Sequence, residues 1–257
     1  MTVAQGLSLF VGAVCAGALN AVAGGGTFVV FPILVFLGIP PIQANATCTA
    51  ALWPGDMASV IAYRRTLGGQ GGRLRWFGVA SVLGGALGAV LLLRTPERRF
   101  TQLIPVMLLG AALLFTFGPA LVAKVRGSAR EGRVHLGLGT AAVLQFAVAI
   151  YGGYFGAGMG IMMLALFSLL PFEGIHAMNG LKALLGVMLN GLAIVIFAWV
   201  GAIAWGPGLL MAAGATLGAF LGATVAQRVH PRWVRGLVIV IAWAMTGYFV
   251  WKSVSAP

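Results

Sequence analysis

The sequence predicts an all-α polytopic membrane protein made of two inverted-topology repeats, each a glycine-broken helical hairpin followed by three transmembrane helices. Sixty per cent of the 257 residues are hydrophobic, only 8% are charged, and the mean hydropathy is +1.02. Soluble domains carry about 25% charged residues, so this composition is typical of a chain that lies in a lipid bilayer. Three runs without Asp, Glu, Lys or Arg (residues 1–55, 134–172 and 183–227) point the same way.

The two repeats are predicted from matches between the halves of the chain. When Gly25 is aligned with Gly158, Ile42 falls on Ile175, and further on "GGALGA" falls near "GATLGA". Each match is weak, but their shared order is what an ancient duplication leaves, and such repeats are common in transporters. We expect a first transmembrane repeat at 1–124, a basic cytoplasmic linker at 125–134 and a second transmembrane repeat at 135–257.

Each half opens with an apolar segment that is too long for one crossing, Ala4–Gly38 and His135–Leu170. At about 1.5 Å per residue, either helix would exceed about 50 Å, against a hydrocarbon core of about 30 Å. Both segments carry glycine clusters near their middle, Gly24–Gly26 and Gly156–Gly160. The simplest prediction is a hairpin with a glycine-rich break. Single spans then follow at 43–63, 76–93, 100–123, 177–200, 207–227 and 237–251.

The loop charges favour hairpins over single crossings. With a hairpin in each half, every loop Lys and Arg falls on one side except Arg94, Arg98, Arg99 and Lys252. By the positive-inside rule the richer side is cytoplasmic, which places both termini outside. Basic residues confined to short loops do not indicate a nucleic-acid partner. The start of the chain has no basic segment before its apolar stretch, so we expect a retained span there and no cleaved signal peptide.

The glycine breaks are predicted to form a small-anion site. Backbone that leaves a helix inside a membrane must be satisfied by protein or by water in a cavity. Glycines allow a positive φ and leave amides free at the start of the next half-helix, where the helix dipole attracts anions. Asn20 and Thr27 flank the first break, and Tyr151 and Tyr154 flank the second. The alternative is that glycine only permits tight helix packing, which we adopt for "GGALGA" and "GATLGA".

Two charges fall inside predicted spans, Asp56 and Lys182. Each such charge costs about 2.5–3.5 kcal/mol on insertion scales, so both call for a reason. Inverted topology would place both near the same cytoplasmic face, where they could pair, or Lys182 could contact an anion or snorkel to the interface. Asp56 could pair, cap a helix after the Trp53–Gly55 kink, or bind a coupling proton. His176, at a span entrance, is a second candidate for proton coupling.

The longest motifs resemble a known family. "NAVAGGGTFVVFPILVFLGIPPIQANAT" (Asn20–Thr47) and "YGGYFGAGMGIMMLALFSLLPFEGIHAMNGLKALL" (Tyr151–Leu185) are similar to the two signatures of the TauE/SafE family of sulfite and organosulfonate exporters. One departure is the absence of a Lys near Thr49 in the first half. By similarity, the residues at the family motifs are Gly24, Gly25, Gly26, Pro32, Tyr151, Gly152, Gly153, Gly156, Gly158, Asn179 and Lys182.

The resemblance implies a multi-pass transporter of the bacterial inner membrane that carries small sulfur-containing anions. We therefore predict a secondary transporter, working as an exporter of sulfonates, sulfite or thiosulfate-like anions; the alternatives are an anion channel and a non-transporting assembly subunit. We expect no enzyme activity, cofactor, metal or catalytic residue; the partners are the anion and the bilayer, and a homodimer stays open. The predicted substrate-binding residues are Asn20, Gly24, Gly25, Gly26, Thr27, Asn45, Thr49, Tyr151, Tyr154, Gly156, Gly158, Asn179 and Lys182.

Overall fold

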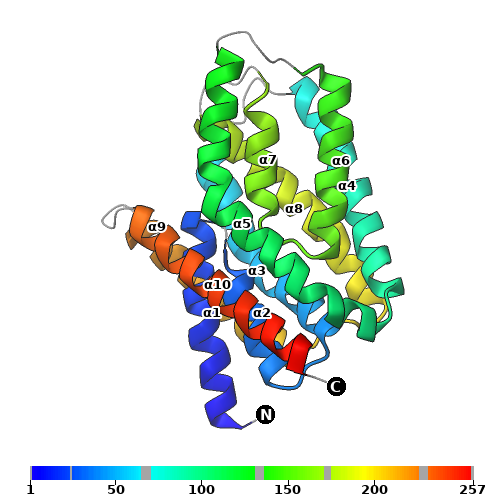
Figure 1. The fold of residues 1–257 in the computed structure, drawn as a ribbon, viewed down its shortest axis with the longest axis vertical. Helices are drawn as coiled ribbons and strands as arrows, with labels where there is room; N and C mark the ends of the chain where they lie inside the picture. The colour runs from blue at the N-terminus through cyan, green and yellow to red at the C-terminus, as the bar shows by residue number, and fades with distance from the viewer. Residues whose placement is uncertain are drawn as a thin grey trace.

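The computed structural model describes residues 2–23, 25–64, 71–130, 136–170, 175–225 and 231–255, and this part of the chain is helical without strands (Figure 1). This confirms the predicted all-α class. The helices are α1 (Val3–Ala23), α2 (Thr27–Phe36), α3 (Pro41–Tyr63), α4 (Gly71–Arg94), α5 (Glu97–Arg130), α6 (Leu138–Tyr154), α7 (Met159–Phe167), α8 (Ile175–Trp199), α9 (Trp205–Val225) and α10 (Pro231–Ser255).

Several helices are able to cross a membrane. Four stretches are long and apolar enough on their own: Val3–Asn20, Leu74–Arg94, Glu97–Val125 and Ala177–Trp199. Shorter apolar stretches lie in α2, α6, α9 and α10. Since α2 has 10 residues and α7 has 9, each extends only about 15 Å and cannot cross the core alone. The chain is a multi-pass membrane protein in which α2 and α7 are half-helices.

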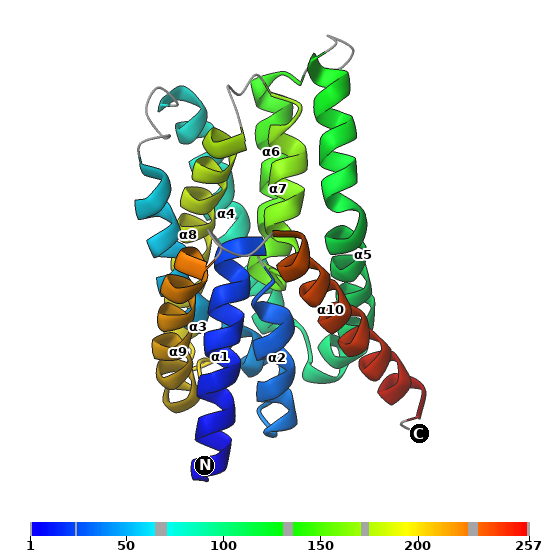
Figure 2. The same ribbon diagram turned by 90° about the vertical axis from the view of Figure 1, so that its left-hand side faces the viewer.

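Both long apolar segments break at their glycine clusters, as predicted. The first break separates α1 from α2, and the second separates α6 from α7. Figure 2 shows that the α1–α2 hairpin opens toward the lower end of the molecule and the α6–α7 hairpin toward the upper end, so the breaks face each other between the two ends. An inverted repeat requires this arrangement, and the repeat itself stays a prediction.

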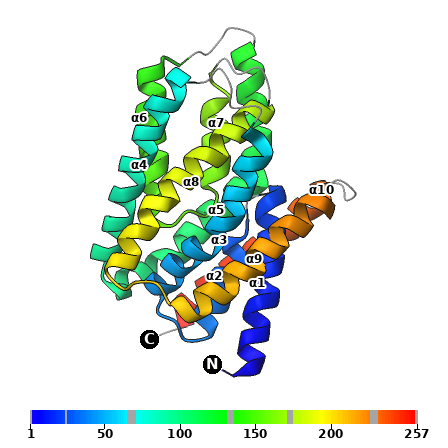
Figure 3. The same ribbon diagram turned by 180° about the vertical axis from the view of Figure 1, so that it is seen from behind.

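Helices of the two halves pack against each other in matching pairs. The first helix of each half lies along the fourth helix of the other, α1 on α9 and α6 on α4 (Figure 3). The third helices follow the same rule, α3 on α9 and α8 on α4, and α3 also meets α8. Each half therefore completes its packing only with the other half, so the two form a single helical body.

Glycine stripes bring these helix pairs close together. A Cβ atom at Gly17 of α1 would collide with the backbone of Ala215 in α9, and one at Gly218 would collide with the Val14 carbonyl. In the other pair, a Cβ atom at Gly88 of α4 would collide with the Ile150 carbonyl of α6. Gly88 and Gly218 belong to "GGALGA" and "GATLGA", so the packing interpretation of those motifs is confirmed.

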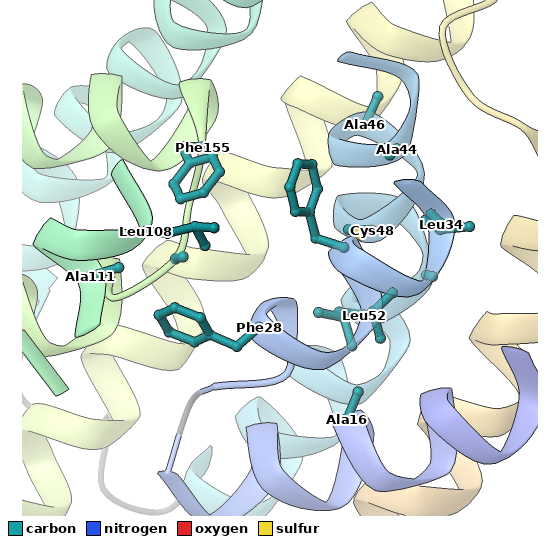
Figure 4. Close-up of a cluster of buried hydrophobic side chains, with 14 of the residues drawn as sticks. Ala16, Phe28, Leu34, Ala44, Ala46, Cys48, Leu52, Leu108, Ala111 and Phe155 are labelled. Carbon is teal, nitrogen blue, oxygen red and sulfur yellow. The ribbon is translucent and has the colours of Figure 1, made fainter. Parts of the chain in front are cut away.

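An apolar cluster joins the two breaks at the centre of the molecule. Phe28 at the start of α2 and Phe155 in the second break are 1% and 2% exposed and belong to one buried cluster with Leu108 and Ala111 of α5 (Figure 4). The ring of Phe31 meets the ring of Phe155 edge to face, with centroids 6.0 Å apart. Side chains of the first hairpin therefore reach the second break.

The extents of α3 and α5 differ from what the sequence predicts. α3 continues as one helix through Pro54, so Asp56 lies within a helix and does not cap a new one. α5 continues to Arg130 and so enters the range predicted as a linker, whose remaining residues 131–134 lie outside the described part of the chain. The division into two repeats and a linker stays a prediction.

Candidate functional site

The second break has the backbone geometry that the sequence predicts. Gly156 and Gly158 adopt φ values of +82° and +81°, in the left-handed region that favours glycine, and Gly158 is the N-cap of α7. The Tyr151 hydroxyl donates a hydrogen bond of 2.6 Å to the carbonyl of Ala157. This bond ties the end of α6 to the middle of the break, so the start of α7 is held in a fixed place.

The first turn of α7 leaves one amide free. The amides of Met159 and Ile161 donate to the carbonyls of Gly156 and Gly158, at 3.2 and 3.0 Å. Among the described residues, the Gly160 amide between them has no hydrogen-bond partner. The first amides of a helix have no intrahelical acceptor and carry its positive dipole end. Gly160 therefore presents an unpaired donor in the membrane interior.

Lys182 of α8 lies against this turn. A Cβ atom at Gly160 would be 3.3 Å from Lys182 Cδ and 4.0 Å from Nζ, so the stem and ammonium of Lys182 follow the backbone of Gly160. The Lys182 side chain is half-buried. It finds no hydrogen-bond acceptor among the residues that the structure describes. A cation and an unpaired amide thus stand side by side at the positive end of a helix.

Asp56 of α3 is bound by two amides from neighbouring helices. Asn20 Nδ2 of α1 donates to Asp56 Oδ1 at 2.9 Å, and Asn190 Nδ2 of α8 donates to Oδ2 at 3.5 Å. The Lys182 ammonium is close enough for its charge to act on the Asp56 carboxylate. Asp56 and Lys182, which the sequence placed near the same membrane face, therefore form one electrostatic cluster with Asn20 and Asn190.

The first break differs from the second. Gly26 has a helical φ of −57°, so the positive φ that glycine allows is not adopted there. The amides of Phe28 and Val29 donate to the carbonyls of Gly25 and Gly26, at 3.1 and 3.0 Å, so these two amides are paired within the start of α2. Glycine at position 26 allows the start of α2 to lie close to α1, because a Cβ atom there would be 2.7 Å from the Ala16 carbonyl oxygen.

Gly24 and Thr27 are the other predicted residues at the first break. Gly24 lies outside the described residues. Thr27 is the first residue of α2 and is half-buried.

Asn45 and Tyr154 join α3 to the end of α6. Asn45 is 2% exposed, and its Nδ2 donates to the Tyr154 carbonyl at 3.1 Å, while its Oδ1 has no partner. The Tyr154 hydroxyl is 3.1 Å from Thr95 Oγ1, between α4 and α5. Thr49 donates to the Asn45 carbonyl at 3.1 Å. These contacts support the backbone before the second break and are separate from the Asp56 cluster.

The remaining predicted residues lie on α8. Asn179 is half-buried, one turn before Lys182. His176 lies in the first turn of α8, and its side chain is outside the described part of the structure.

Two polar contacts were not predicted from the sequence. Gln145 of α6 is fully buried and donates from Nε2 to Ser81 Oγ of α4 at 2.9 Å. Thr47 Oγ1 accepts a hydrogen bond of 3.0 Å from the Ala204 amide before α9. The signal for the Gln145 contact was a single Gln in an apolar run without charges, because Gln side chains in membranes form hydrogen bonds between helices. No group of three His, Cys, Asp or Glu residues able to hold a metal occurs among the described residues.

Comparisons with known proteins give the family. Residues 9–249 match the family model described as sulfite exporter TauE/SafE. The chain is 31% identical to a "Probable membrane transporter protein" of Haemophilus influenzae, over 91% of this chain and 90% of that protein. It is 27% identical to "Probable membrane transporter protein ORF9" of Sinorhizobium sp, over 92% and 89% of the two chains. For "Probable membrane transporter protein YfcA" of Escherichia coli the identity is 25%, over 95% and 89%.

No solved structure matches the chain. The family match covers nearly all of both halves, and the relatives align over most of their own length. Together with the apolar helices, these findings show that the chain belongs to the sulfite exporter TauE/SafE family and is a membrane transporter.

Proposed function

We propose that the chain is a secondary transporter that exports small sulfur-containing anions, such as sulfonates, sulfite or thiosulfate-like anions, across the bacterial inner membrane. One observation carries this proposal: the free amide of Gly160 and the ammonium of Lys182 lie side by side without an acceptor among the described residues. An oxyanion supplies acceptors for both donors. A sulfonate group has three such oxygens around one sulfur and can bind both at once.

The electrostatics of the second break favour a small anion. The start of α7 carries about half a positive charge and the Lys182 ammonium lies beside it, so the two together attract an anion more strongly than either does alone. The left-handed glycines, Gly156 and Gly158, hold this helix end inside the membrane. In an interior of low dielectric constant, the attraction between this end and an anion is stronger than in water.

The other predicted residues are assigned roles around this site. Tyr151 holds the break, and Asn179 precedes Lys182 on the same helix, where its amide can orient a second oxygen. Residues of the first break, Asn20 and Thr27, and the α3 residues Asn45 and Thr49 would line the path on the other side. Movement of one half against the other would expose the site alternately, driven by an ion gradient or by the gradient of the substrate.

Flux through purified protein in proteoliposomes tests the proposal. Wild-type protein is expected to take up radiolabelled sulfite, thiosulfate or isethionate, and Lys182→Ala is expected to abolish that uptake because the cationic half of the site is lost. Lys124→Ala is the matched control, because Lys124 is an exposed Lys of α5 and is not among the residues that form the break. Equal flux in wild type and Lys182→Ala would remove Lys182 from the site and contradict the proposed function.

Two further measurements define the kind of transport. Counterflow, in which unlabelled anion inside accelerates uptake of labelled anion, is expected of a carrier and is absent from a channel. Thermal shifts with sulfite, thiosulfate, sulfate, taurine, isethionate and sulfoacetate rank the substrates, because a ligand that binds the folded state raises its apparent stability. No shift with any of these anions in wild type would contradict the substrate class.

A further inference from the structure

The Asp56 carboxylate lies next to the proposed anion site, and binding of the anion does not by itself require a carboxylate there. Asp56 lies inside α3 and accepts hydrogen bonds from Asn20 and Asn190, at 2.9 and 3.5 Å, with Lys182 in electrostatic range. The described part of the chain has one other carboxylate, Glu97, which is exposed in the first turn of α5 and accepts a hydrogen bond of 2.9 Å from the Ile42 amide. Asp56 is thus the carboxylate that the fold places among the central helices.

Lys182 is the charge that balances Asp56. α3 packs against α1, α2, α5, α8 and α9. Within their described residues, α1, α2 and α9 have no Asp, Glu, Lys, Arg or His, and Cys15 of α1 is exposed. The charged residues of α5 lie in its end turns, and those of α3 are Asp56 itself and the flanking Arg64. On α8, Lys182 is the charged residue within electrostatic range of Asp56 among the described side chains.

One cation serving two anions creates a charge imbalance. Without substrate, Lys182 and Asp56 neutralise each other. When an anion binds Lys182 at the start of α7, the anion and the Asp56 carboxylate share a single positive charge in a medium of low dielectric constant. A net charge moved through the membrane interior is costly, and like charges at a shared site favour protonation of one of them. A proton on Asp56 restores neutrality.

We propose that Asp56 is the proton-binding site of this transporter. Asp56 takes up one proton from the aqueous phase when a singly charged anion occupies Lys182, and it returns the proton to the other phase when the anion leaves. Proton and anion therefore cross together and in the same direction, so export is driven by the outward gradient of the substrate and not by an inward proton gradient. This inference rests on the proposed function and names its coupling ion.

Proton movement with isethionate tests this coupling. Isethionate is a suitable probe because its sulfonate stays ionised throughout the neutral range, so any proton that moves belongs to the protein. Full-length protein is placed in proteoliposomes that contain the pH dye pyranine, with the membrane potential clamped by valinomycin and potassium. An inward isethionate gradient is expected to acidify the lumen with wild type, with one proton taken up per isethionate.

Variants assign the proton to Asp56. Asp56→Asn is expected to carry isethionate without acidifying the lumen. Its flux is expected to depend on the membrane potential, since the loaded site is then neutral while the empty site, with Lys182 alone, bears a positive charge. Asp56→Glu keeps a carboxylate and is expected to stay coupled. Glu97→Gln is the matched control, because it removes the exposed carboxylate outside the site and leaves acidification at the wild-type level.

Each outcome decides the proposal. Wild-type isethionate flux without acidification overturns the coupling and leaves the proposed function intact. Acidification by Asp56→Asn equal to that of wild type places the proton elsewhere and overturns the assignment to Asp56. If wild type moves no isethionate, transport of sulfonates fails and the coupling fails with it. Should Asp56→Asn not reach the membrane, Asp56→Ser carries the same expectation.

Discussion

The left-handed glycine at the start of α7 gives a prediction that connects the fold to the site. Gly158 has φ +81°, and a Cβ atom there would lie 3.4 Å from Leu114 Cδ1 and 3.6 Å from Ala111 Cβ, which is ordinary contact. Gly158→Ala therefore costs backbone strain and no collision. A non-glycine residue in this conformation costs about 1–2 kcal/mol. At about 2–4 °C per kcal/mol, the melting temperature should fall by about 2–8 °C.

A matched glycine on a regular helix should respond in the opposite direction. Gly110 of α5 lies in helical backbone with nothing within 4 Å of an added Cβ atom. Gly110→Ala should raise stability by up to about 1 kcal/mol, because alanine loses less backbone entropy in a helix. The two alanine variants should therefore differ by about 1–3 kcal/mol.

The assays are thermal unfolding of purified protein in detergent, followed by tryptophan fluorescence, and isethionate flux in proteoliposomes. Gly158→Ala should lower flux as well as stability, because relief of the strain moves the start of α7 and with it the Gly160 amide. Gly110→Ala should leave flux unchanged. Equal melting temperatures and equal flux for the two variants would refute the reasoning that the positive φ of Gly158 holds the site.

Three further predictions concern packing and charge. Gly218→Ala forces α9 away from the Val14 carbonyl and should lower stability by about 1–3 kcal/mol in thermal unfolding; no change would mean that this crossing is not tight. Lys182→Met leaves Asp56 without its counter-charge and should destabilise the fold by up to about 3–5 kcal/mol, and adding Asp56→Asn should recover part of the loss. Additive effects in that double-mutant cycle would argue against the pair. Thr47→Val leaves the Ala204 amide unpaired and should cost about 1–3 kcal/mol, with Thr47→Ser as the variant that retains stability.

The positions of the helices follow closely from local sequence. The six single spans predicted from apolar runs correspond to α3, α4, α5, α8, α9 and α10, and both glycine clusters interrupt helices. Apolar run length and glycine content act on a few neighbouring residues, so they can be evaluated without knowledge of the fold. The extension of α5 to Arg130 was missed, because a basic segment at the end of a span resembles a loop in composition.

The difference between the two breaks did not follow from composition. Gly26 has a helical φ, and the carbonyls of Gly25 and Gly26 accept hydrogen bonds from the first turn of α2, whereas Gly156 and Gly158 are left-handed and the Gly160 amide stays free. Glycine permits both conformations, and its neighbours choose between them. Gly26 lies close to the Ala16 carbonyl of α1, which is a contact between helices.

Local sequence was enough to show that this chain lies in a membrane, roughly where its helices lie, and which residue types are unusual in its spans. The contact of Lys182 with Gly160 and the hydrogen bonds from Asn20 and Asn190 to Asp56 became visible in the three-dimensional packing alone. Hydropathy and helix breaking depend on neighbours in the chain, whereas these contacts join α1, α3, α7 and α8. Such contacts arise from the packing of whole helices across both halves, which no local pattern encodes.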